Sequence, residues 1–303
     1  MTFGEHVFRY CERGASDALL AEPLNALSNI AFLVAALIGL QLVLWRRPEE
    51  RSPDQFLLCG LVFLVGLGSL AFHVFATQGA ELLDVIPISV FMLVYLGFAL
   101  NRFLGVPPGF MVLLVIGFTT IMALTMQVKC WEGGIGIPGP ELQGVKPCLN
   151  GSIFYLPALI ALVVVGLLAD EREHRAAPYL LWAAAILTVS ITLRSLDFAL
   201  CDRIEISGRK VGTHFAWHIL NAIALFLMLR ASLEGAPSLS PARIAAPIDE
   251  PGAAQVEPAV ETPPAKASPP KPLAERVAPA DEEAAKEDEA PEEEGERKVF
   301  FPA

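Results

Sequence analysis

The sequence predicts an all-α membrane protein, a seven-transmembrane helix bundle followed by a disordered C-terminal tail. The chain has 303 residues, of which 54% are hydrophobic, and its mean hydropathy is +0.51. The apolar residues fall in runs of about 20, the length that crosses a hydrocarbon core ~30 Å thick. A soluble core explains a run of about 10 to 14 apolar residues, but it does not explain seven long runs in succession.

The predicted spans follow one another with short connections, except for segment 129–151, which is rich in glycine and proline and holds two cysteines. The spans are 24–45, 56–75, 84–100, 109–128, 152–169, 178–198 and 212–230. The first run lacks the short apolar core and cleavage site of a signal peptide, so we expect this helix to direct insertion itself. No internal repeat is evident, which argues against an inverted-repeat transporter.

The net charge of −11 belongs mainly to the C-terminal end of the chain. Residues 234–303 carry 16 acidic and 7 basic side chains and are rich in alanine, proline and glutamate. Such a segment buries too little apolar surface to offset its ordering entropy. We therefore predict a transmembrane domain at 1–233 and a disordered acidic tail at 234–303. No basic stripe indicates nucleic-acid binding.

The cysteines indicate the orientation in the membrane, which the lysines and arginines leave undecided because seven lie on each predicted side. Four cysteines fall on the side of the N-terminus, namely Cys11, Cys130, Cys148 and Cys201. Four cysteines on one face suggest two disulfides, which persist only in an oxidising compartment. We expect the N-terminus outside the cytoplasm and the tail inside.

Three of the five histidines lie in apolar surroundings near helix ends. His214 and His218 are four residues apart, which places both imidazoles on one helix face. His73 ends the second predicted helix, and the alternating topology brings all three to the same membrane depth. A lone buried histidine is more often a satisfied core residue than a ligand. Three at one depth instead favour a zinc site with three protein ligands and one open position.

Two polar residues are expected beside such a metal. Ser69 lies one helical turn before His73, and Asp84 opens the third predicted helix on the same side. The Asp84 carboxylate could take a proton from water, and the Ser69 hydroxyl could donate to an oxyanion. Each has a structural alternative, because Asp84 suits a helix N-terminus and Ser69 permits close helix packing. Their placement favours the catalytic interpretation.

Arg194 and Asp197 lie near the outer end of the sixth predicted helix. Charges at such a position mark a functional site by default. Because the two residues are three apart, they are also placed to pair with each other. A structural ion pair and a functional role therefore both remain open for these residues.

The ordered motifs of the chain resemble those of the alkaline ceramidases, within a membrane hydrolase superfamily that includes the progestin and adiponectin receptors. The motifs are Tyr-Cys-Glu at 10–12, Ala-Glu-Pro-Leu-Asn-Ala-Leu-Ser-Asn at 21–29, Gly-Ser-Leu-Ala-Phe-His at 68–73, Glu-Leu-Leu-Asp at 81–84, Asp197 with Cys201, and His214 with His218. The resemblance covers roughly residues 10–230. The residues of these motifs look more like those of bacterial members, which implies a multi-pass protein of the bacterial inner membrane.

The resemblance implies hydrolysis of the amide of ceramide, or of a related N-acyl lipid, to a free amine and a fatty acid. It implies zinc held by His73, His214 and His218, with Asp84 and Ser69 as the catalytic aspartate and serine. It also implies a disulfide between Cys11 and Cys201.

The resemblance further implies a calcium region near the N-terminus, which Glu12 and Glu22 match, with Asp197 and Arg194 close to the site. Arg9 and Gly14 stand where an aspartate and an asparagine are expected. An arginine in place of a carboxylate argues against a tight calcium site.

Two other functions compete with the lipid amidohydrolase. One is a receptor or signalling protein of the same superfamily, in which zinc has a structural role. The motif at 21–29 favours the ceramidase branch over this alternative. The other is a transporter, which would need polar groups continuing to the opposite face of the bundle, where the helices offer almost none.

Overall fold

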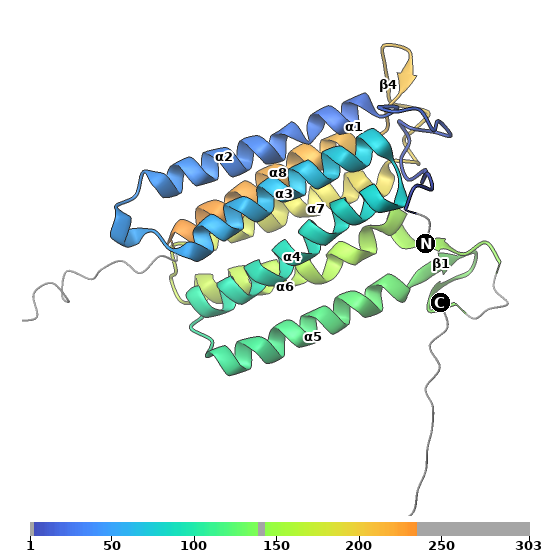
Figure 1. Ribbon diagram of the computed structural model, residues 1–303. Coiled ribbons are helices and arrows are strands. Elements are labelled where there is room, and N and C mark those ends of the chain that lie inside the picture. The colour runs from blue at the N-terminus through green and yellow to red at the C-terminus, as the bar shows by residue number, and fades with distance from the viewer. Residues whose placement is uncertain (1–2, 139–142, 235–303) are drawn as a thin grey trace, which may run out of the picture. The chain divides into compact units, whose positions relative to one another are not determined.

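The computed structural model describes residues 3–138 and 143–234. Seven helical segments in this part of the chain are long and apolar enough to cross a membrane, which confirms the predicted architecture (Figure 1). The helices are α1 (Pro23–Ser28), α2 (Ile30–Leu44), α3 (Pro53–Phe75), α4 (Gln78–Arg102), α5 (Pro108–Gln127), α6 (Leu156–Glu171), α7 (Ala177–Leu196) and α8 (His214–Glu234). Short 3-10 helices are η1 (Pro48–Glu50) and η2 (Cys148–Tyr155). The predicted tail lies outside the described residues, apart from Glu234.

The first predicted span is divided at Asn29 into α1 and α2. Two side chains there bond to a carbonyl of the preceding turn, since Ser28 Oγ and Asn29 Nδ2 each donate to the Asn25 carbonyl oxygen at 2.8 Å. Such local side-chain bonds compete with the helix ladder. Asn25, Ser28 and Asn29 are all buried at this break.

The start of α4 differs from the sequence prediction, which placed Asp84 at a helix N-terminus. Thr77 is the cap instead, because its hydroxyl accepts a hydrogen bond from the Ala80 N–H. Ala76, in the left-handed region, ends α3 just before it. Asp84 therefore lies in the second turn of α4, where the cap explanation for this residue no longer applies.

Helices α3 and α4 approach closely at Gly68. A Cβ atom at this position would collide with the carbonyl oxygen of Leu83. Small residues permit this kind of backbone contact between membrane helices. Because the next residues along the two helices are Ser69 and Asp84, the contact brings those two side chains together.

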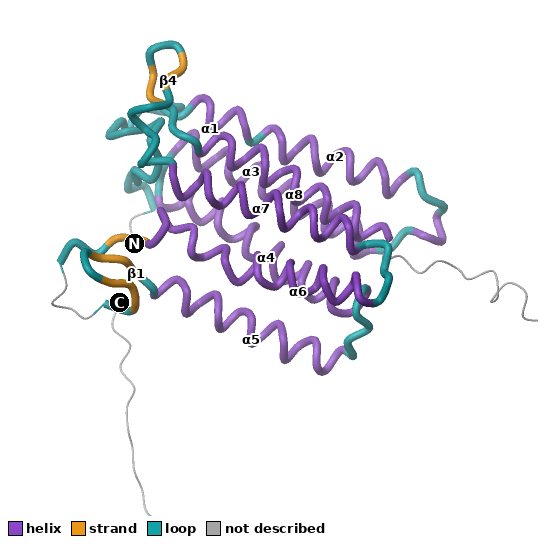
Figure 2. Tube along the Cα trace, turned by 180° about the vertical axis from the view of Figure 1, so that it is seen from behind, coloured by secondary structure: helices purple, strands orange, loops and turns teal. Residues whose placement is uncertain are grey.

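The five short strands found among the described residues lie at one end of the bundle, together with the N-terminal segment (Figure 2). They are β1 (Lys129–Trp131), β2 (Gly134–Gly136), β3 (Lys146–Pro147), β4 (Glu205–Ile206) and β5 (Arg209–Lys210), paired in the orders β2-β1-β3 and β4-β5. Two disulfides tie this end, with Cα–Cα distances of 5.6 Å for Cys11–Cys201 and 5.0 Å for Cys130–Cys148. The two expected disulfides are thus present, and one of them is the Cys11–Cys201 pair that the resemblance implies.

The helices differ in how much of their surface faces protein. The apolar window of α8 is 61% buried, whereas that of α5 is only 11% buried. Accordingly, α8 runs through the middle of the bundle and α5 lies at its edge (Figure 1). The helix that carries His214 and His218 is thus the one most enclosed by the others, which keeps these side chains away from lipid.

Candidate metal centre

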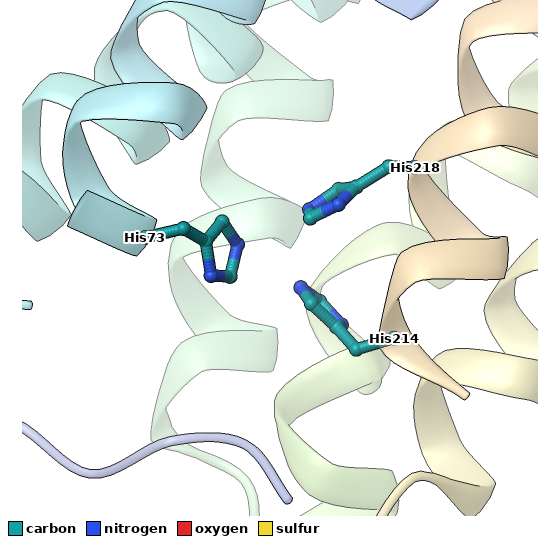
Figure 3. A group of neighbouring side chains, drawn as sticks. All are labelled: His73, His214 and His218. Carbon is teal, nitrogen blue, oxygen red and sulfur yellow. The ribbon is translucent and has the colours of Figure 1, made fainter. Parts of the chain in front are cut away.

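The three predicted histidines converge at the strand-bearing end of the bundle. His73 comes from the last turn of α3, and His214 and His218 come from the first two turns of α8. All three are buried, with exposed fractions of 0%, 1% and 0%. One ligand atom from each lies within 4.8 Å of the others, and the rings point toward one another (Figure 3).

Hydrogen bonds on the far side of two rings fix which nitrogen carries the proton. His73 Nδ1 lies 2.7 Å from Glu22 Oε2, and a carboxylate can only accept, so this nitrogen is protonated. His218 Nδ1 lies 2.7 Å from Ser28 Oγ, whose own hydrogen is donated to a backbone carbonyl. Ser28 therefore accepts from His218. Both rings are left with a lone pair on Nε2.

Each of the three histidines has a buried ring nitrogen without a partner among the described residues. His73 Nε2, His218 Nε2 and His214 Nδ1 are all buried without a hydrogen bond. Unpaired buried polar atoms are costly, and a cation would compensate the two Nε2 lone pairs where a ligand atom of His214 also lies within 4.8 Å. Imidazole is a preferred ligand of zinc. The residues present therefore fit the metal that the sequence predicted.

Glu22 accepts a hydrogen bond from His73 and belongs to a buried ionic network. Arg13, 3% exposed, donates through Nε to Glu22 Oε1 and through Nη2 to the His73 carbonyl oxygen at 3.0 Å. Asn25 Nδ2 donates to Glu22 Oε2 at 2.9 Å. Burial alone would raise the pKa of Glu22, but the hydrogen bonds from His73, Asn25 and Arg13 outweigh it and lower that pKa. Glu22 thus remains a carboxylate.

The other predicted acidic residue of this region, Glu12, caps α1. Its two carboxylate oxygens accept from the backbone N–H groups of Leu24 and Asn25, both at 2.8 Å. Burial raises the pKa of Glu12, and these two bonds oppose that rise. The carboxylates of the predicted calcium region are therefore both engaged by protein groups.

Ser69 and Asp84 lie beside each other next to His73. The Ser69 hydroxyl is close to the Asp84 carboxyl, without the geometry of a hydrogen bond, and Asp84 is within electrostatic range of His73. Ser69 is 1% exposed and Asp84 is half-buried. Ser69 Oγ and Asp84 Oδ1 have no partner among the described residues. Both groups are thus free to bond to a substrate or a water.

Arg194 and Asp197 do not pair with each other, so that structural alternative is wrong. Asp197 accepts three backbone N–H groups, from Cys11 at 2.8 Å, Thr213 at 2.8 Å and His214 at 3.0 Å. It thereby caps α8 and fixes the helix start that carries His214. Arg194 instead turns toward η2 and the N-terminal segment.

Aromatic rings enclose His214. The ring of Tyr10 stacks on it with centroids 3.5 Å apart, and Trp217 lies parallel on it at 5.3 Å. Sequence reasoning singled out neither ring, nor Arg13 and Ser28, for the site. Tyr10 and Ser28 occur within the quoted motifs, but only the structure shows their contacts with the histidines.

Comparison with known protein families decides the classification. A family model described as Ceramidase matches residues 8–233. The chain belongs to the ceramidase family. The match includes every residue of the metal centre, and it ends where the sequence predicted the end of the transmembrane domain. A search of curated protein sequences gave no match.

Membership in the ceramidase family indicates a hydrolase that acts on amide bonds. It also confirms the family resemblance read from the motifs. The seven apolar helices indicate a multi-pass membrane protein.

Proposed function

We propose that this protein is a zinc-dependent amidohydrolase that cleaves ceramide or a related N-acyl lipid within the bilayer. The observation that carries the proposal is the convergence of three buried histidine rings beside the Asp84 and Ser69 side chains. Zinc held by His73, His214 and His218 would supply a Lewis acid at this point. The remaining chemistry falls to the side chains around it.

The reaction joins an amide and a water to give a carboxylate and an ammonium ion. Asp84 Oδ1 takes a proton from the attacking water as its oxygen bonds to the amide carbon, and the C–N bond then breaks. The same carboxyl returns the proton to the departing nitrogen, because an unprotonated amine leaves poorly. The Ser69 hydroxyl donates to the oxygen that gains negative charge.

An apolar cavity of about 80 Å³ extends the site into the bundle. Its walls include Val65, Ile88 and Asn221, which lie one helical turn from Ser69, Asp84 and His218, respectively. Most of the other lining side chains are aliphatic or aromatic. This cavity suits the first methylene groups of a hydrocarbon chain of the substrate, with its amide at the metal centre.

The test is hydrolysis by the purified full-length protein of a panel of N-acyl lipids, with ceramide as the first member. We expect release of fatty acid, loss of that release on zinc chelation, and recovery when zinc is returned. A protein that holds one zinc per chain and cleaves no N-acyl lipid would instead support the receptor or signalling alternative.

We further infer that the end bearing the metal centre faces away from the cytoplasm, as in an inner-membrane protein with its N-terminus outside. Both disulfides lie at this end, and disulfides persist in oxidising compartments. The end of α8 at Glu234 then faces the cytoplasm. Intact cells treated with a membrane-impermeant thiol reagent after mild reduction should label Cys130 or Cys148, and labelling only in opened cells would reverse this orientation.

A further inference from the structure

A second cavity, of about 400 Å³, opens beside the metal centre at the strand-bearing end of the bundle. Its lining includes Tyr10, Tyr155, Arg194 and Lys129. Tyr155 lines the apolar cavity as well, and the Tyr10 ring stacks on His214. The second cavity therefore borders both the proposed chain site and a proposed metal ligand, at the end of the helices where lipid headgroups lie.

Arg194 makes no direct ion pair in this cavity, although the Asp84 carboxyl interacts with it electrostatically at longer range. Five other arginines do form ion pairs with carboxylates, namely Arg9, Arg13, Arg46, Arg102 and Arg230. Arg194 forms no ion pair with any described residue. Its contacts are neutral, namely the Asn150 carbonyl oxygen at 2.7 Å, Ser152 Oγ at 3.0 Å and the Tyr10 hydroxyl at 3.1 Å. A half-buried charge left in this way is costly unless a ligand pairs with it.

The guanidinium also has donors to spare. It carries five N–H groups, and the described residues accept three hydrogen bonds from it. Its Nε is buried without a partner. The aromatic rings of Tyr10, Tyr155 and Trp217 surround it, with centroids 5.3 to 5.7 Å from Cζ. They hold the guanidinium in place without neutralising it.

The other charges of the cavity leave an excess of positive charge. Glu81, the one acidic residue of the lining, is held by both sides of Arg9, through Nε at 2.9 Å and Nη2 at 3.1 Å. Lys129 donates only to the Met126 carbonyl oxygen and forms no ion pair within the described chain. Arg194 and Lys129 thus remain as two cations of the lining without a direct ion pair among the described residues.

We propose that the preferred substrates are N-acyl lipids whose amine half carries an anionic group, a carboxylate or a phosphate, which Arg194 binds in this cavity. The inference rests on the proposed amide hydrolysis and narrows its substrate class. Arginine recognises both anions through charge-assisted, often bidentate, hydrogen bonds. The acyl chain occupies the apolar cavity, and the anion sits on the polar side of the scissile amide.

The experiment compares three amides that share one acyl chain: an N-acylethanolamine, an N-acylglycine and an N-acylphosphoethanolamine. The wild-type full-length protein should show a kcat/KM at least about 10-fold higher for one or both anionic amides, the range of a charge-assisted hydrogen bond. The two anionic arms separate carboxylate from phosphate recognition. Equal or better cleavage of the neutral amide would overturn the proposal.

Arg194→Gln should remove that preference, lowering kcat/KM about 10- to 100-fold more for the anionic amides than for the neutral one, mainly through KM. Arg194→Lys keeps the charge but loses the planar guanidinium that can bind an anion through two hydrogen bonds, so it should retain part of the preference. If the only role of Arg194 is to hold η2 in place, the Lys and Gln variants should lower kcat/KM equally for all three amides. Arg172→Gln is the matched control, because this arginine binds the Leu104 carbonyl oxygen away from the cavity.

Binding of the same three amides, measured by titration calorimetry, separates this proposal from the hydrolase proposal. Anion-selective binding that Arg194→Gln abolishes, without cleavage of any amide, would retain the anion site and refute the hydrolase. Cleavage without anion selectivity would refute the anion site alone.

Discussion

The contact between Glu22 and His73 gives a quantitative prediction for the substitution Glu22→Gln. Glutamine keeps the shape of the side chain but has one acceptor oxygen where glutamate has two. In the native site Oε1 faces Arg13 Nε, and Oε2 faces both His73 Nδ1 and Asn25 Nδ2. Whichever way the amide turns, its NH₂ group must face a donor. Either Arg13 or His73 therefore loses its acceptor.

Two effects follow, and their magnitudes differ. Loss of an outer partner of a metal-bound histidine weakens metal binding about 10- to 100-fold, which is ~1.4 to 2.7 kcal/mol. Breaking a buried ion pair from one side costs about 3 to 5 kcal/mol of folding free energy. Both Arg13 and Glu22 are almost fully buried, so solvent screening does not reduce this second effect.

The assay is zinc affinity by chelator competition, measured alongside the free energy of unfolding. Glu50→Gln is the control, because Glu50 pairs with Arg46 at the other end of α2, where both are partly exposed and such a pair contributes about 0 to 1 kcal/mol. Wild-type zinc affinity in a folded Glu22→Gln protein would refute the inferred orientation of His73.

Four other predictions concern single features of the site and the chain. Asp84→Asn should lower kcat at least ~10²-fold with zinc content unchanged, and Ser69→Ala should cost less; wild-type turnover in the aspartate variant would exclude its proton-transfer role. Gly68→Ala should destabilise the fold by about 1 to 3 kcal/mol, because its methyl group meets the Leu83 carbonyl, and should slow hydrolysis of a saturating substrate. Cys201→Ser should reduce stability by roughly 2 to 5 kcal/mol, seen as a lower Tm, whereas Cys59→Ser, at the free cysteine, should change it less. Deletion of residues 240–303, whose composition predicts no core, should preserve expression and activity, and loss of either would contradict that interpretation.

Much of the fold could be predicted from local patterns in the sequence, such as run length and residue spacing. Membrane spans are set by the thickness of hydrocarbon, so run length alone located seven of them. The spacing of His214 and His218 fixed one helix face, and alternating topology placed His73 beside them. Their convergence in the structure confirms this part of the prediction.

The parts that sequence reasoning missed depend on contacts between distant segments. Arg13 gives no periodic signal, yet it reaches both Glu22 and the carbonyl of His73. The spacing of Arg194 and Asp197 suggested that they pair with each other. In the structure each instead forms hydrogen bonds with groups from distant segments. The helix start before Asp84 was placed too late because a polar first turn of α4 carries little hydropathy signal, although Thr77 caps it.

The division of the three histidines between α3 and α8 has a consequence during biosynthesis. His73 enters the membrane early, whereas His214 and His218 arrive with the last helix. A nascent or prematurely terminated chain that lacks α8 can offer only one of the three imidazoles. The proposed metal centre can therefore form only after the last helix has been synthesised, so an unfinished chain is expected to lack the proposed hydrolase activity.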